Sequence, residues 1–474
     1  MLRFSRILSA LALTAALGAC VAGPAPEIAT PTPQLPANYL YAPDGQTSAS
    51  LSALLPSRDP AFLELAAQAL ENSPSLGEAA ARIETARARA RGAGANRLPS
   101  VSADGSVVGN RINPNQFGDG AGQGGFIDAE QVSYGANLVA SWDADLFGRL
   151  RAQERAALAR IDAATASASA VRIALISEIA GNVVDWRTLS ARADALKEDV
   201  LAAQQLADLA KAREDAGLAP GFDRVRAEAA ASASRSRLAS LESDRARIIG
   251  RLVTLAGIDG QSVNAALAQG RPFLEPAQPP ASLPSELLAN RPDVVAATAE
   301  LAATDEDLAA TARSRFPQLT LSAVVGLLAF SPGDLFDEDS IVGTLTAGVA
   351  GPLLDFGRIE AEIDGAAANK KAAFAAYRGT VYQALGDAET AYGLIEASDA
   401  EAKLALQERD ELERAARLAN TRYRAGLADF LTVLEARRAA DASGERAAAV
   451  LGRAQRARIL LWQALGGEDF GETS

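Results

Sequence analysis

The sequence has no histidine, a single cysteine and few aromatic residues, which make up 5% of its 474 positions. The missing imidazoles argue against a histidine-based catalytic site, and one thiol gives no basis for a metal site of His and Cys ligands. Basic residues are scarce too: 46 stand against 59 acidic ones, so the formal net charge is −13. That charge disfavours a nucleic-acid partner, because phosphates would not be neutralised. Nothing resembles a catalytic constellation, so we do not expect an enzyme.

The first twenty residues are typical of a bacterial lipoprotein signal. A short charged start and an apolar run lead to Leu17-Gly18-Ala19, and the only cysteine, Cys20, follows directly. We expect residues 1–19 to be removed and Cys20 to carry a covalent lipid, palmitate among its acyl chains, that anchors the chain. The alternative is an ordinary signal with an incidental buried cysteine. No other cofactor is expected, and no other apolar run approaches the roughly 20 residues of a membrane-spanning helix.

Most of the sequence pattern occurs twice. Leu146-Phe147-Gly148-Arg149 recurs as Asp355-Phe356-Gly357-Arg358, and Ala216-Gly217-Leu218-Ala219 recurs as Ala425-Gly426-Leu427-Ala428, in both cases 209 residues later. Asn72 and Asn290 pair at an offset of 218, so the register slips once, in a variable loop between Pro99 and Gly148. Few folds repeat at this length, so the duplication restricts function as well as shape.

The duplication predicts how the chain is divided. A proline-rich arm follows the anchor, because such a segment cannot build a core. The two repeats come next, joined by a second proline-rich stretch. We expect the arm at 20–60, the first repeat at 61–256, the linker at 257–283, the second repeat at 284–466 and a short tail at 467–474.

Each repeat contains two runs that alternate with period two, which predicts β-hairpins at about 100–142 and 318–352. In the last run Leu345 and its apolar neighbours oppose Thr344 and Thr346. Each run has about the 9–11 residues of a tilted membrane-spanning strand, although half-buried strands of a soluble sheet are the alternative. Four strands cannot close a barrel, and open edges in lipid are costly, so spanning strands require several chains in one barrel. A conducting pore needs more than two copies, because eight strands are filled by side chains.

Two long helical hairpins are expected after the strand pairs. No proline interrupts residues 148–219 or 357–474. The breaks at 216–221 and 425–429 let the chain turn back, with glycine ending one helix and Asp223 beginning the next in the first copy. The alternative is a pair of ordinary solvated helical hairpins.

The order and spacing of these motifs resemble the TolC-type outer-membrane efflux channel family, within it the lipidated branch that serves RND-type multidrug pumps. The matching features are the lipoprotein signal, the two strand-to-helix junctions, Asn290-Arg291-Pro292-Asp293-Val294 and the paired Gly-Leu tips. The resemblance implies a mixed α and β fold of mainly long helices, in which a homotrimer forms a 12-stranded barrel in the outer membrane, continued by a periplasmic α-helical barrel. It also implies passive export of small toxic compounds or drugs, with a periplasmic adaptor protein and an inner-membrane pump as partners.

The resemblance carries over to part of a periplasmic gate. Asp223 matches an aspartate that holds the entrance closed, and Tyr423 matches the tyrosine that it contacts. Ala428 stands where the best-known member of the family has an arginine, and Arg422, Arg424 and Arg224 are the candidates to replace it. Glu435 matches the second of two inward-facing acidic positions, and Thr432 replaces the first. Each charge has a simpler alternative as a solvated helix end, and Asp223 has one as a helix cap that contributes about 1 kcal/mol.

The tips are the expected adaptor contacts by the same resemblance: Gly217, Leu218, Gly426 and Leu427. An exposed leucine at the end of a rigid helical pair offers an apolar knob, whereas a leucine folded back as part of a C-cap would not. Two other functions remain open: a protein-secretion duct of the same fold, and a lipid-anchored periplasmic scaffold of helical hairpins with soluble sheets.

Overall fold

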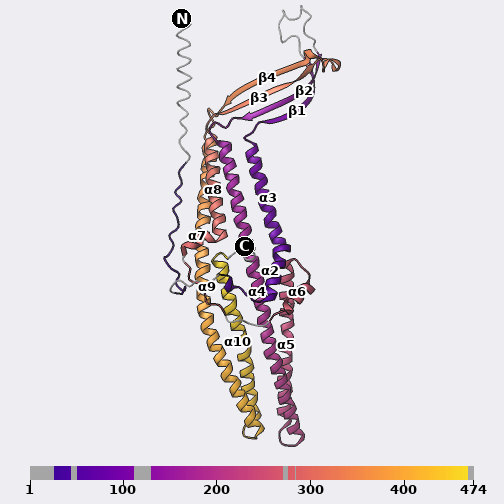
Figure 1. Cartoon of the computed structure of the whole chain (residues 1–474), viewed down its shortest axis with the longest axis vertical. Helices are drawn as coiled ribbons and strands as arrows, with labels where there is room; N and C mark the ends of the chain where they lie inside the picture. The colour runs from indigo at the N-terminus through magenta and orange to yellow at the C-terminus, as the bar shows by residue number, and fades with distance from the viewer. Residues whose placement is uncertain (1–25, 44–50, 112–129, 271–275, 283, 468–474) are drawn as a thin grey trace, which may run out of the picture. The chain divides into compact units, whose positions relative to one another are not determined.

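The computed structural model describes residues 26–43, 51–111, 130–270, 276–282 and 284–467. Long helices dominate these ranges, with a single four-stranded sheet among them (Figure 1). The chain divides into two compact units. The first comprises Glu84–Asp162 and Ala299–Ala375 with residues up to Thr30, and the second comprises Pro31–Ile83, Ala163–Thr298 and Ala376–Ser474. Each unit therefore draws on both sequence repeats.

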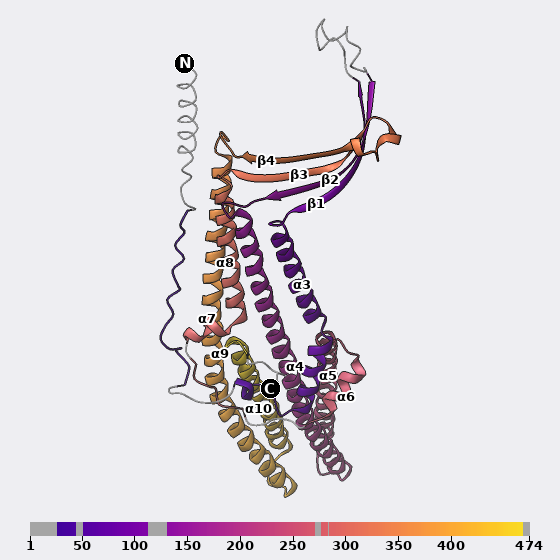
Figure 2. The ribbon, with the colours of Figure 1, turned by 45° about the horizontal axis from the view of Figure 1, so that its top comes forward.

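The sheet of the first unit is built from the four alternating runs, which confirms the strands predicted from the sequence. Its strands are β1 (Ser100–Arg111), β2 (Glu130–Asp143), β3 (Gln318–Ala329) and β4 (Ile341–Ala350), in the order β1-β2-β3-β4 and antiparallel throughout. They curve together as one ribbon (Figure 2). Two short 3-10 turns, η4 (Pro332–Asp334) and η5 (Glu338–Ser340), join β3 to β4. The variable loop expected between β1 and β2 lies largely outside the described residues.

Parts of four helices complete the first unit. They belong to α3 (Pro74–Ala95), α4 (Arg149–Asp215), α8 (Pro292–Arg313) and α9 (Arg358–Arg424). The duplicated junctions begin α4 and α9: the Asp145 carboxylate accepts from the Leu150 N–H at 2.9 Å, and the Asp355 carboxylate accepts from the Ile359 N–H at 2.9 Å. These bonds satisfy amides that a helix start leaves without partners.

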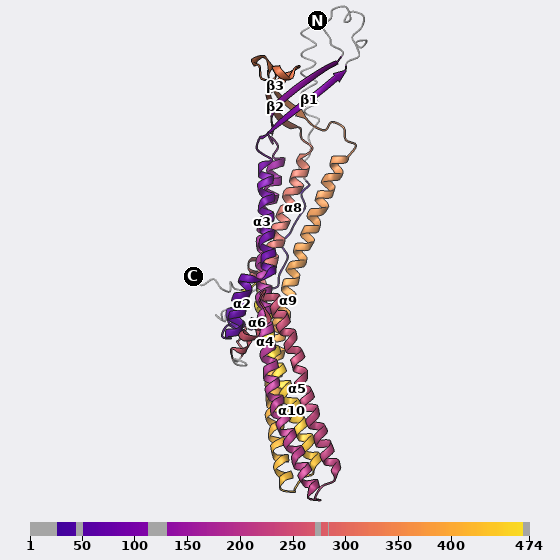
Figure 3. The ribbon, with the colours of Figure 1, turned by 90° about the vertical axis from the view of Figure 1, so that its right-hand side faces the viewer.

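The second unit contains the main hydrophobic core. Besides α4 and α9 it holds η1 (Leu51–Leu54), α2 (Pro60–Asn72), α5 (Gly221–Ala256), α6 (Gly260–Ala268), η3 (Pro284–Glu286), α7 (Leu287–Asn290) and α10 (Phe430–Ala464). Figure 3 shows α4 with α5 and α9 with α10 as the two helical hairpins of this unit. The largest side chains buried in the core include Phe62, Leu65, Ile179, Leu252 and Trp462.

The repeated Asn and Gly residues have a shared packing role in this unit. Gly257 and Gly466 both have positive φ, 68° and 95°, and a side chain on either would come within 2.5 Å of a backbone oxygen. The oxygen belongs to Asn72 in the first copy and to Asn290 in the second. Only glycine allows the end of α5 to approach the last residue of α2, and the end of α10 to approach the last residue of α7, so closely. This packing explains why both glycines recur.

One expectation about the helices is wrong. Among the described residues, α4 contains an 18-residue window of mean hydropathy 1.3, which meets the length and composition of a membrane-spanning helix. No such run is expected from the sequence after the signal. The helix buries Leu175, Ile176 and Ile179 in the core of the second unit, and 28% of the apolar window is buried in the single chain.

Candidate functional site

The two hairpin turns of the second unit end α4 and α9 in the same way. The Leu218 N–H donates to the Arg213 carbonyl at 2.8 Å, and the Leu427 N–H donates to the Arg422 carbonyl at 2.8 Å. Gly217 and Gly426 take φ values of 68° and 71°. This pattern is the Schellman motif, which satisfies the last helical carbonyls and requires a left-handed residue.

The leucines at these turns point away from the protein. Leu218 is 73% exposed and Leu427 is 70% exposed. The alternative in which they fold back onto the cap is therefore wrong. Phe222, Val225 and Leu431 are also exposed apolar side chains near the turns. The hairpin ends thus present the apolar knobs expected from the sequence.

Tyr423 is buried just before the second turn. Its ring lies 6.1 Å from that of Phe430 in an edge-on arrangement, and the Arg213 guanidinium lies 4.5 Å from its centroid. Leu206, Ala227 and Val433 belong to the same small apolar cluster, which we call the tip cluster. Arg213 of the first hairpin therefore covers an aromatic ring of the second.

Asp223 lies in the first turn of α5 but does not cap it. The N-cap residue is Pro220, and no side chain accepts a capping bond there. The alternative in which Asp223 is the N-cap of this helix is therefore wrong. Within the described part of a single chain, no hydrogen bond or ion pair joins Asp223 to Tyr423, so their pairing remains a prediction about the assembled protein.

The second hairpin places a carboxylate differently. Asp429 is the N-cap of α10 and accepts from the Thr432 N–H at 2.7 Å. The hydrogen bonds from Thr432 hold the pKa of Asp429 below its usual range. Thr432 and Glu435 are exposed on the same helix. Glu435 is thus accessible, as an inward-facing gate residue would have to be.

The arginine candidates fall into two groups. Arg224 is held by Glu214 at 2.7 Å and by Glu228 at 3.0 Å, both in its own hairpin. Arg422 and Arg424 are exposed. Sequence reasoning overlooked Arg213, although it lies 209 residues before Arg422 and the repeat offset could have found it.

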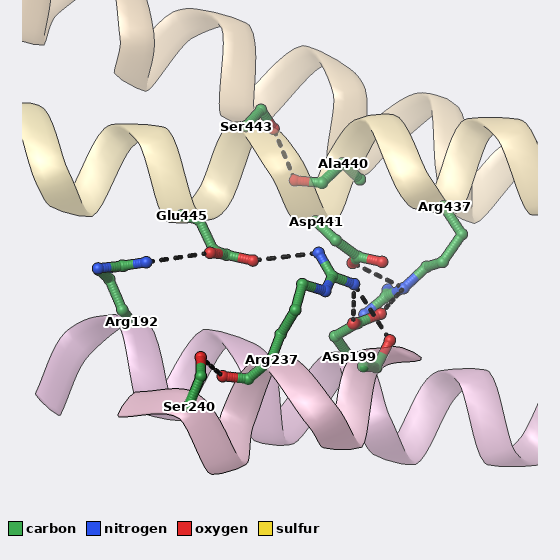
Figure 4. Close-up of polar contacts among 10 residues, drawn as sticks. Arg192, Asp199, Arg237, Ser240, Arg437, Ala440, Asp441, Ser443 and Glu445 are labelled. Carbon is green, nitrogen blue, oxygen red and sulfur yellow. Dashed lines mark hydrogen bonds and ion pairs between the residues drawn. The ribbon is translucent and has the colours of Figure 1, made fainter. Parts of the chain in front are cut away.

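Sequence reasoning also missed a cluster of charged groups around two aspartates whose side chains are buried. Asp199 of α4, Arg237 of α5, and Arg437 and Asp441 of α10 meet within the second unit (Figure 4). Arg192 and Glu445 extend it, at 3.4 Å from each other. No motif or repeat spacing marks these positions, because the residues 209 positions away from Asp199 and Asp441 are Glu408 and Ser232.

Nothing in the described ranges groups three or more metal-ligating side chains. Cys20 lies outside the described residues, so its lipidation stays a prediction. The site is therefore one of surfaces and charges at the end of two helical hairpins.

Comparison with known proteins gives an independent view of the chain. A family model described as outer membrane efflux protein matches residues 65–258 and 283–467. The pyoverdine export outer membrane protein OpmQ of Pseudomonas aeruginosa is 30% identical over 466 residues, which cover 97% of this chain and 96% of OpmQ. The toluene efflux pump outer membrane protein TtgI of Pseudomonas putida is 28% identical, covering 92% of both chains.

The fold has counterparts among solved structures. The outer-membrane channel OprN superimposes with a TM-score of 0.83 at 24% identity, covering 94% of this chain and 99% of OprN. At that identity the likeness concerns the fold. Both sequence repeats and both units take part in it.

Proposed function

The chain belongs to the outer membrane efflux protein family, and from that premise we propose that it is the channel subunit of a tripartite efflux system. It is an outer-membrane efflux protein with the TolC-type fold, and not an enzyme. Three copies would form one passive channel, with a 12-stranded barrel in the membrane and a helical barrel in the periplasm. The partners are a periplasmic adaptor protein and an RND-type inner-membrane pump.

The observation that carries the channel proposal is the open sheet. Every residue of the edge strands β1 and β4 is exposed in the single chain. The sheet order leaves an outer edge on each of them. In lipid, unpaired backbone groups at such edges cost several kcal/mol each, so β4 of one copy must pair with β1 of the next. A periplasmic scaffold would have no use for two fully exposed edges.

The names of two relatives support a class of substrate. OpmQ is named for pyoverdine export and TtgI for toluene efflux, and both are small molecules. We therefore favour small toxic compounds as substrates over the protein-secretion duct of the same fold.

Two substitutions on β4 test the barrel. Leu345 and Thr346 are adjacent, so their side chains point to opposite faces, and both are exposed in the single chain. Leu345→Arg should block membrane insertion and conductance in planar bilayers, because an arginine facing lipid near the midplane costs about 2–4 kcal/mol. Thr346→Arg, facing the lumen, should still insert and conduct. Equal behaviour of the two variants, or a wild-type protein without conductance, would refute the barrel.

The gate proposal rests on Asp223, Tyr423, Arg424 and Glu435 at the tip end. Because Asp223 is not the helix cap, its carboxylate is available for a contact in the assembled channel. Asp223→Ala should raise resting conductance and antibiotic leak. Asp215→Ala, at the opposite side of the same turn, is the matched control and should leave the leak unchanged. An unchanged leak in Asp223→Ala would remove Asp223 from the gate.

The anchor proposal rests on the sequence around Cys20. If Cys20 carries the lipid, Cys20→Ser should abolish labelling with radioactive palmitate while the barrel still assembles. Persistent labelling of Cys20→Ser would show that Cys20 is not the lipid-carrying residue.

A further inference from the structure

The charged cluster of Asp199, Arg237, Arg437 and Asp441 separates two apolar regions of the second unit. On one side is the tip cluster around Tyr423, and on the other is the main core around Trp462. Both apolar regions join residues of the first hairpin to residues of the second. The charged residues between them are therefore the part of this interface most sensitive to charge and water.

The contacts within the cluster cross between the hairpins. The Asp199 side chain is 3% exposed and accepts from Arg237 Nη2 at 3.1 Å. Arg437 Nε lies 3.0 Å from Asp441, which shares its helix, and 3.8 Å from Asp199 on α4. Arg237 also reaches Glu445 of α10 at 3.2 Å. Buried carboxylates are thus held against arginines from two helices, α5 and α10.

A cavity of about 320 Å³ lies beside these residues. Its wall includes Asp199, Arg237, Arg437 and Asp441 together with small side chains such as Ala227 and Ala230. A cavity of this size with charged side chains in its wall has room for water, which a change in charge could draw in.

Building on the proposed channel function, we propose that the Asp199–Asp441 pair and its arginines form a proton-dependent clamp between the hairpins. The clamp holds α10 of the second hairpin against α4 and α5 of the first, and it loosens when the pair loses its proton. Since the tip cluster lies next to it, loosening the clamp opens the tip end of the channel.

The chemistry of the pair gives the direction of the effect. Burial, followed by the hydrogen bond that the protonated Asp441 carboxyl donates to the Asp199 carboxylate, raises the pKa of Asp441 to about 8, against the opposing charges of Arg437 and Arg237. With the proton present, the two carboxyl groups share a hydrogen bond. Without it, two adjacent negative charges are buried, and the arrangement becomes less favourable than a hydrated one.

Proton linkage gives the direction in which pH changes the clamping equilibrium. The clamped state binds the proton more tightly than a hydrated, open state, in which an aspartate titrates near its ordinary value of about 3.9. Clamping is therefore strongest at low pH and weakens as pH rises toward 8, by at most about tenfold in the equilibrium constant per pH unit. Above the raised pKa of Asp441 the dependence ends, because both states are then ionised.

The groups that face Asp441 come from three helices. They are Asp199 on α4, Arg237 on α5, and Arg437 and Arg438 on α10. Glu445 on α10 contacts Arg237, and Arg192 on α4 joins the cluster through Glu445. No α9 residue is among the described residues that line the cavity. Arginine stays charged throughout the pH range of the test, so only the carboxyl groups can change their charge there.

The test compares wild-type trimers with Asp441→Asn across pH 5 to 9. Asparagine has the shape of a protonated aspartate and cannot ionise. Two readouts are needed: conductance in planar bilayers, and hydrogen exchange of the first four turns of α10, corrected for the intrinsic pH dependence of exchange. We expect both to rise with pH in the wild type and to level off near pH 8, and both to stay low and flat in Asp441→Asn.

Asp199→Asn sharpens the result, because it removes the neighbouring charge that helps to raise the pKa of Asp441. Its opening curve should move to lower pH, a shift that a merely structural role would not produce. Glu401→Gln, at an ion pair with Arg453 of 2.6 Å inside the second hairpin, is the control and should follow the wild type.

The outcomes separate the clamp from the channel. The clamp is overturned if Asp441→Asn keeps the wild-type pH slope in exchange, or if the wild type conducts and its conductance is independent of pH. If the wild type does not conduct but its exchange still depends on Asp441, the channel proposal fails and the clamp stands.

Discussion

The two tips share a helix ending and differ in the helix that follows. Both turns close with glycine and the same pair of backbone bonds. In the second copy the N-cap of the following helix is Asp429, whose carboxylate caps it. In the first copy the N-cap is Pro220, whose side chain has no acceptor. Three positions on, the first copy has Asp223 and the second has Thr432. Each copy thus keeps one carboxylate across these two positions, Asp429 as a cap and Asp223 uncommitted to capping.

The arginines of the tips differ in the same way. Arg213 and Arg422 occupy equivalent positions, yet Arg213 lies over the Tyr423 ring and Arg422 is exposed. The first hairpin therefore uses its arginine to cover the second hairpin. The duplicated backbone fixes where the tips turn, whereas single substitutions decide which charges are free to act there.

The largest effect is expected from Tyr423→Ala. The ring is buried against Phe430 and Arg213, so its loss should destabilise the tip cluster by about 3–5 kcal/mol, the range for truncating a large aromatic side chain. Hydrogen exchange around residues 419–434 would measure this. Tyr423→Phe keeps the ring and is the control. A Tyr423→Ala variant as protected as wild type would contradict the packing of this residue.

Next in size is the contrast between Arg213→Ala and Arg422→Ala. The first removes a cation from an aromatic face, an interaction of about 0.5–2 kcal/mol. The second changes an exposed side chain and should stay within about 0.5 kcal/mol. Thermal unfolding and exchange at the tip compare them directly. Equal effects would mean that the two copies are not specialised as the contacts indicate.

Asp429→Ala tests the capping difference and should speed exchange in the first turn of α10 several-fold. The pKa of Asp429 is lowered in the folded protein, so the cap contributes above the ordinary value of about 3.9 and is lost as pH falls through the folded pKa. Wild type and Asp429→Ala should therefore converge in acid. Pro220→Ala, which removes no cap, is the matched control in α5. Continued divergence in acid would rule out a carboxylate cap.

The sequence was sufficient for the repeat, the strands and the turns, because each has a local signature. Alternation marked β3 and β4, and Gly217 and Gly426 marked the turns. The tip leucines were also placed correctly, since a Gly-Leu pair at a helix end leaves few options. What failed was local reasoning about Asp223, where proline took the cap position and left the carboxylate one turn further on.

Contacts between distant segments had no such signature. Arg213 and Tyr423 are 210 residues apart, and Asp199 and Asp441 are further apart still. Long-range pairs of this kind depend on how two helical hairpins pack, which neither periodicity nor capping rules describe. The repeat offset offered a clue to Arg213 alone, because the charged cluster combines residues from non-equivalent positions of the two copies.

The smallest effect on folding is expected at the tips themselves. Leu218→Ser and Leu427→Ser change side chains that are 73% and 70% exposed, so unfolding should shift by no more than about 0.5 kcal/mol. If the leucines are adaptor contacts, however, the same variants should lose cross-linking to the adaptor and raise drug susceptibility in cells. Leu404→Ser, at an exposed leucine on α9 away from the tips, is the control. If Leu218→Ser and Leu427→Ser lose adaptor cross-linking to different degrees, the adaptor distinguishes the two tips. The surrounding charges would then be the reason, because the backbones of the two turns are the same.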